Sequence, residues 1–80
     1  MKLKDVIQIA PEDQMIRVLL TYDIIGDGFA YKFAGWKEDV IKAIESNIDD
    51  ENLIMDSEVQ LIRGSIVKGV LYTVIVGLVK

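Results

Sequence analysis

The sequence predicts an α+β fold in which a small antiparallel β-sheet, in the element order β-β-β-α-β-β, carries one amphipathic helix on one face. Three observations support this. Residues 58–80 alternate like one long hairpin, residues 15–33 alternate like a shorter one, and residues 36–48 repeat apolar side chains every four positions. With 80 residues and no linker-like tract, we expect one domain spanning 1–80.

The C-terminal hairpin is the most informative segment. A turn at Lys68-Gly69 places Val67 opposite Val70, and the same pairing continues to Val59 opposite Leu78. The second strand, residues 70–79, is apolar on both faces, so both faces need cover. One helix covers one face of a small sheet, and we therefore expect the other to meet a second copy of the chain or a partner.

This pattern predicts an interaction surface on the hairpin. Its candidate residues are Ile62, Arg63, Ile66, Leu71, Thr73 and Ile75. Arg63 is a cation on a face that it shares with Val59 and Leu61. Such a cation either lies at the rim of the sheet or pairs with a carboxylate or an anionic ligand, and we favour a rim position or pairing between subunits.

Three further strands are predicted before the helix. Residues 3–10 form a short apolar run that Pro11 ends. Residues 15–25 alternate, with Ile16, Val18 and Leu20 on one side, and the Gly-rich residues 26–28 then predict a turn. Residues 29–33 follow as a strand with its three aromatic side chains on one face.

The helix is expected over residues 36–48, with Trp36 in the core. The four-residue repeat also includes Val40, Ile44 and Ile48. Residues 49–52 then predict a loop or a single helical turn that leads to a strand starting near residue 54 or 55.

Composition excludes several classes of function. The chain lacks cysteine, which excludes disulfides and thiolate metal sites, and it lacks histidine, the commonest general base. Its net charge of -4 argues against nucleic acid and anionic membrane partners. No segment resembles a signal peptide or a membrane helix, and we expect a cytoplasmic protein. A hydrophobic share of 51% favours a homo-oligomer.

No catalytic constellation emerges, so we predict that the protein is not an enzyme and uses no cofactor or metal. The serines have no histidine partner. The carboxylates between 49 and 58 resemble a solvated loop, although a bound cation stays an open alternative. The aromatic residues around Trp36 fit a core better than a stacking platform.

Part of the hairpin resembles one known family. The run from Glu58 through Arg63-Gly64 to Ile66, followed by Gly69 and Tyr72-Thr73-Val74, is similar to the second hairpin of dodecins. Dodecins are small strand-helix-strand-strand subunits that assemble into hollow oligomers and bind flavins. Asp56 stands where dodecins have a flavin-stacking Trp, and Thr73 replaces a ligand-contacting Gln, so the resemblance implies assembly but no flavin site.

Three functions are thus considered. The preferred one is a non-enzymatic interaction or assembly module that associates with itself through its C-terminal hairpin. The first alternative is a dodecin-like oligomer that binds or stores a flavin-type ligand. The second is a small acidic regulator or inhibitor that docks a protein partner through its helix or an exposed sheet edge.

Overall fold

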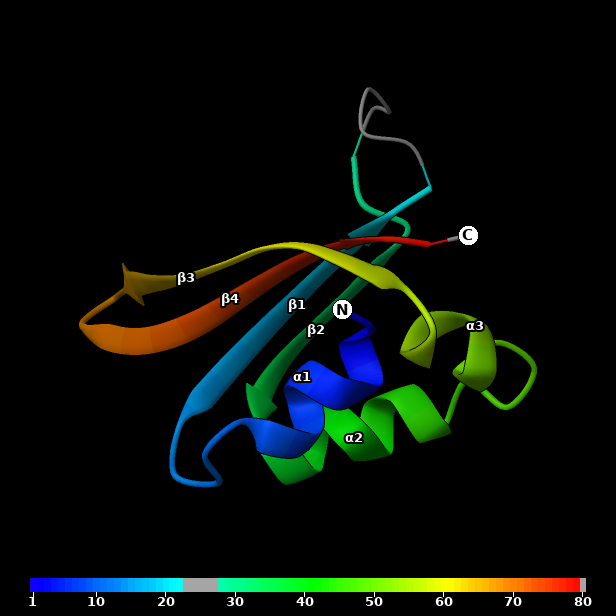
Figure 1. Ribbon diagram of the computed structural model, residues 1–80. Helices are drawn as coiled ribbons and strands as arrows, with labels where there is room; N and C mark the ends of the chain where they lie inside the picture. Colours follow the sequence, from blue (N-terminus) through cyan, green and yellow to red (C-terminus); the bar gives the residue numbers. More distant parts are fainter. Residues whose placement is uncertain (23–27, 80) are drawn as a thin grey trace.

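The computed structural model describes residues 1–22 and 28–79, and it shows three helices packed on one face of a four-stranded sheet (Figure 1). The elements in chain order are α1 (Leu3–Ile9), β1 (Met15–Thr21), β2 (Tyr31–Trp36), α2 (Lys37–Glu45), α3 (Glu51–Met55), β3 (Glu58–Val67) and β4 (Val70–Leu78). The strand order across the sheet is β2-β1-β4-β3.

The α+β class is confirmed, but the sheet is mixed rather than antiparallel throughout. The two hairpins β1-β2 and β3-β4 are antiparallel, as predicted, and they meet through a parallel pairing of β1 with β4. The helical segments between β2 and β3 carry the chain back across one face, which allows the last strand to run beside the first. Alternation within each hairpin says nothing about how two hairpins join, so the sequence could not reveal this pairing.

The strand predicted over residues 3–10 is wrong, because this segment forms α1. Its buried residues are Leu3, Val6 and Ile7, whose i, i+3, i+4 spacing is that of one helical face. An apolar run this short fits either structure by periodicity alone. Pro11 does end the element, as expected, since the helix ends at Ile9.

Both strands of the first hairpin differ from their predicted bounds. β1 ends at Thr21, and β2 runs from Tyr31 to Trp36, later in the chain than the predicted residues 29–33. Ile16, Val18 and Leu20 of β1 do face the core, as their alternation indicated. Phe29 lies outside β2 and is 42% exposed, so only two of the three aromatic residues share the inner face of the strand. The turn predicted over residues 26–28 lies largely outside the described residues.

The predicted long helix is confirmed only in its middle. Val40 and Ile44 of α2 are buried, but α2 ends at Glu45, and Ile48 is 85% exposed. The core position predicted for Trp36 is wrong: it is the last residue of β2, it precedes the first helical residue, and its side chain is 49% exposed. Trp36 has the four-residue spacing of the buried α2 residues Val40 and Ile44, but it belongs to the strand before the helix.

The segment after α2 holds another short helix rather than the beginning of a strand. This helix, α3, buries Ile54 completely. The next strand, β3, starts only at Glu58. Of the loop or single helical turn predicted from residue 49, the helical alternative agrees with this five-residue helix, whereas the strand start predicted near residue 54 or 55 is wrong.

The register of the C-terminal hairpin is confirmed from Val67–Val70 to Leu61–Val76. Beyond that point a β-bulge at Gln60 shifts the register, so Val59 lies opposite Gly77 rather than Leu78. The turn residues Lys68 and Gly69 both have positive φ, 51° and 81°, which identifies a type I′ turn.

The core lies between the three helices and the inner face of the sheet, to which β2 contributes the half-buried Tyr31 and Phe33. Ile75 is fully buried there together with Ile16 and Ile54. Gly77 is closely surrounded, because a Cβ at this position would lie 2.9 Å from Leu20 Cδ2 and 3.0 Å from the Glu58 carbonyl oxygen. None of the described helices is both long enough and apolar enough to cross a membrane.

Candidate functional site

The outer face of the sheet, opposite the helices, is covered by none of the described elements (Figure 1). Strand register arranges its side chains in rows across the four strands. One row runs Ala34, Arg17, Val74, Arg63; the row on one side of it runs Trp36, Met15, Tyr72, Ser65, and the row on the other runs Lys32, Leu19, Val76, Leu61. This face therefore combines apolar side chains with three cations.

The hairpin β3-β4 extends past the helices, which leaves apolar side chains exposed on its inner face as well (Figure 1). Ile62, Ile66 and Leu71 are 47%, 73% and 61% exposed. Ile66 and Leu71 lie directly opposite one another, and Ile62 lies opposite Ile75. These three exposed residues, which we call the hairpin patch, all belong to the sequence-based candidate surface.

The other three candidate residues lie in different environments. Ile75 shares the inner face with the hairpin patch but is buried beneath the helices. Thr73 is half-buried, and its hydroxyl donates a hydrogen bond to Gln14 Oε1 at 2.9 Å. Arg63 is exposed on the outer face, across Val74 from Arg17. The structure thus places Arg63 on the opposite face from the hairpin patch, whereas Ile75 adjoins the patch as the cross-strand partner of Ile62 but is buried.

The outer edge of β3 is partly paired. The backbone N–H of Val59 donates to the Met1 carbonyl at 2.8 Å, and the N–H of Leu3 donates to the Ser57 carbonyl at 2.9 Å. The N-terminal segment therefore covers the first part of this edge. From Leu61 to Val67 no described segment pairs with it, because β3 is the last strand of the sheet.

Charged side chains divide between the two layers of the molecule. On the helix side and at the N-terminus, Lys2 and Lys4 each lie 3.6 Å from Asp56, and Lys42 lies 3.2 Å from Glu38. Lys37 Nζ donates to the carbonyls of Gln8 and Ala10, at the end of α1. Within the described residues, the sheet cations Arg17, Lys32 and Arg63 have no such partner.

Three of the acidic residues between 49 and 58 have separate partners. Asp56 pairs with the two lysines, Asp50 accepts a hydrogen bond from Tyr31, and Glu58 binds the N-terminal ammonium at 3.0 Å. No group of three or more carboxylates able to hold a metal ion occurs in residues 1–22 and 28–79.

A phenol pair links β1, β2 and the segment before α3. The hydroxyls of Tyr22 and Tyr31 lie 3.2 Å apart, and Tyr31 donates a hydrogen bond to Asp50 Oδ2 at 2.9 Å. The hydrogen bond with Tyr22, followed by that with Asp50, raises the pKa of the Tyr31 phenol well above its ordinary value. Tyr31 also stacks on Phe33 with ring centroids 6.4 Å apart. Tyr31 therefore ties β2 to the segment before α3 through its hydrogen bond to Asp50.

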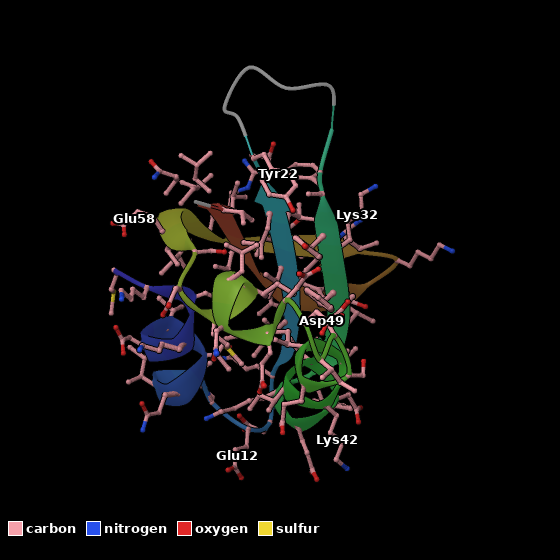
Figure 2. The ribbon with its side chains drawn as sticks, turned by 90° about the vertical axis from the view of Figure 1, so that its right-hand side faces the viewer. Glu12, Tyr22, Lys32, Lys42, Asp49 and Glu58 are labelled. Atoms are coloured by element: carbon pink, nitrogen blue, oxygen red, sulfur yellow. The ribbon has the colours of Figure 1, made fainter. Side chains whose placement is uncertain are left out.

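A shallow cleft of about 590 Å³ runs along α2, lined in part by Glu12, Trp36, Asp39 and Lys42. Figure 2 shows Glu12 and Lys42 near one end of the molecule and Lys32 toward the other. The cleft mixes both charge signs, and its Lys42 is already paired with Glu38. It therefore lacks a set of convergent groups suited to one ligand.

In comparisons with known proteins, no protein-family model, curated protein or solved structure matches the chain. The residues themselves are then the only guide to function. Sequence reasoning found the hairpin patch and Arg63, but it did not single out Arg17 or Lys32. Each is a lone cation within an alternating strand, and only the pairing of β1 with β2 and β4 places them on one face.

Proposed function

We propose that this protein is a non-enzymatic assembly module that associates with a second copy of itself along the unpaired part of β3. The observation that carries this is the hairpin patch beside an open strand edge. An edge strand exposes backbone N–H and C=O groups that can pair with another strand, and natural proteins usually protect such edges. Between Leu61 and Val67, this edge has one charged residue, Arg63, and no proline.

The free edge is complementary to itself in one antiparallel register. With Gly64 on a two-fold axis, Ile62 lies opposite Ile66 of the partner subunit, and Leu61 lies opposite Val67 of the partner subunit. Arg63 meets Ser65 of the partner subunit, so no like charges are directly opposed. The register thus pairs apolar side chains with apolar side chains on both faces.

The backbone agrees with the same register. In a two-residue hairpin the closing pair, Val67–Val70, is hydrogen-bonded, and hydrogen-bonded pairs recur at every second position. Ile62, Gly64 and Ile66 consequently direct their N–H and C=O groups away from β4. In the proposed register these three residues pair with one another across the axis, which would extend the four-stranded sheet to eight strands.

A symmetric contact of this kind closes on itself and yields a dimer rather than a filament. It would also cover the hairpin patch of both subunits, which adds apolar burial to the backbone pairing. Because no cysteine is present, the assembly would need no oxidising compartment, and we propose the cytoplasm as its location.

We expect Ile66→Lys to weaken the dimer about tenfold, because each subunit then places an ammonium against an apolar side chain of the other. Light scattering after size-exclusion chromatography, over a range of concentrations, measures this against a protomer mass of 9.0 kDa. Ile9→Lys is the matched control, since Ile9 is 72% exposed and lies on α1, away from the hairpin. A wild-type protein that stays monomeric at millimolar concentration would contradict the proposal.

A further inference from the structure

The outer face of the sheet contains a small cavity with two cations and no carboxylate. Its volume is about 170 Å³, and its lining comes from all four strands: Arg17, Lys32, Phe33, Ala34, Val67 and Tyr72. Val67 stands at the end of β3, two strands away from β1 in the sheet order. The twist of the sheet therefore brings the end of the hairpin toward β2 and forms a concave site.

The two cations are placed to act together. Arg17 lies opposite Ala34, and Lys32 lies two residues before Ala34 on the same face of β2. Arg17 and Lys32 are thus diagonal neighbours on adjacent strands, a relation in which Cα atoms lie about 7–8 Å apart. At this separation, the long side chains of Arg17 and Lys32 can both contact one small ligand that lies between them.

Neither cation is neutralised within the described residues, although the chain as a whole is acidic. The described lysines of the helix layer are each paired with a carboxylate or with carbonyl oxygens. Holding two unpaired cations close together on one face costs electrostatic free energy, and binding an anion would recover it. The positive charge of this site therefore favours an anionic ligand from outside the described part of the chain.

We propose that this cavity binds a phosphate group, either as the free ion or as a phosphate monoester. A guanidinium donates two parallel N–H hydrogen bonds to two phosphate oxygens, and an ammonium adds a second positive charge. Their two positive charges match the charge of a phosphate monoester, about -1.5 to -2 at neutral pH, more closely than they match the single negative charge of a carboxylate. The half-buried Tyr72 supplies a hydroxyl donor and a ring at the wall of the cavity.

The cavity is too small for a whole drug-sized ligand, for which about 300–1,000 Å³ is usual. It holds a phosphate and the first atoms attached to it. The remainder of a monoester would lie on the outer face toward Trp36 and Met15, in the row next to Arg17. An aromatic body is favoured there because Trp36 is 49% exposed and offers a stacking partner.

The test is a titration of ¹⁵N-labelled protein followed by amide and Arg side-chain chemical shifts, with inorganic phosphate, phenyl phosphate and acetate as separate probes. We expect both phosphates to shift Arg17, Lys32 and Tyr72, with acetate at least tenfold weaker. Tighter binding of phenyl phosphate than of inorganic phosphate would identify a monoester as the ligand class, and equal binding would identify the free ion. Equal binding of acetate would overturn the assignment of phosphate.

Three variants decide whether these residues form the site. Arg17→Gln and Lys32→Gln should each weaken phosphate binding about tenfold, the value of one lost charge-assisted hydrogen bond. Lys68→Gln is the control, because Lys68 lies in the hairpin turn and does not line the cavity. If Lys68→Gln weakened binding as much as Arg17→Gln did, the response would be to net charge, and the site would be refuted. The cavity lies within one subunit, but Val67 lines it and also lies on the proposed dimer edge, so the titrations are made at a concentration at which the protein is monomeric.

Discussion

Mixing two oppositely charged variants of the hairpin is expected to restore a dimer that neither variant forms alone. One variant carries Ile62→Lys with Ile66→Lys, and the other carries Ile62→Glu with Ile66→Glu. In the proposed register residue 62 of each subunit faces residue 66 of its partner, so each variant alone opposes like charges at two places. We expect both to dimerise about 100-fold more weakly than the wild type, from like-charge contacts and lost apolar burial.

An equimolar mixture places lysine opposite glutamate at both positions. Native mass spectrometry distinguishes the mixed dimer from either parent if one variant is isotopically labelled. We expect the mixed dimer to dominate, and to weaken when the ionic strength rises, since exposed ion pairs are screened by salt. A wild-type-like dimer in either unmixed variant would show that the subunits meet elsewhere, for example along β2.

Ile75→Ala is expected to lower the free energy of unfolding by about 2–5 kcal/mol, the usual cost of truncating a buried isoleucine. Ile75 is fully buried beneath the helices although the sequence placed it on the interaction surface. For a domain of this size, such a loss lowers the midpoint of thermal unfolding by about 10 °C or more. Thermal unfolding followed by circular dichroism, at a concentration where the protein is monomeric, measures the change.

Ile48→Ala is the matched control for that experiment, because the same atoms are removed at a position that is 85% exposed. Its effect on unfolding should stay within about 0.5 kcal/mol. If Ile75→Ala were equally mild, the position of β4 in the centre of the sheet would be wrong.

The sequence predicts the parts of the fold that depend on neighbours along the chain. The register from Val67–Val70 to Leu61–Val76 was correct because a two-residue turn and strict alternation determine it locally. The bulge at Gln60 was missed, since one extra residue in a strand leaves the alternation on either side of it intact and only the pairing with β4 reveals it.

The remaining errors concern contacts between distant segments. The run from Leu3 to Ala10 is compatible with a strand or a helix until Leu3, Val6 and Ile7 are seen to fill the core beneath the sheet. Trp36 continues the repeat of α2, but it lies on the outer face as the cross-strand neighbour of Met15. The candidate phosphate site could not be predicted, because Arg17 and Lys32 lie on strands whose mutual register the sequence leaves open.

The most direct test of the proposed dimer is the rate of disulfide cross-linking of Gly64→Cys under mild oxidation. The chain has no other cysteine, and a Cβ at position 64 has room, since its nearest neighbour is Leu71 Cδ1 at 3.8 Å. On the two-fold axis the two Cα atoms would lie about 5.5 Å apart, within the range that a disulfide spans. In Ser65→Cys they would lie about 8–9 Å apart, beyond that range.

We expect Gly64→Cys to form a covalent dimer much faster than Ser65→Cys at the same protein concentration, as seen on a non-reducing gel. Equal rates for the two variants would mean that cross-linking reflects random collision, and the pairing of β3 with a second copy about Gly64 would be contradicted.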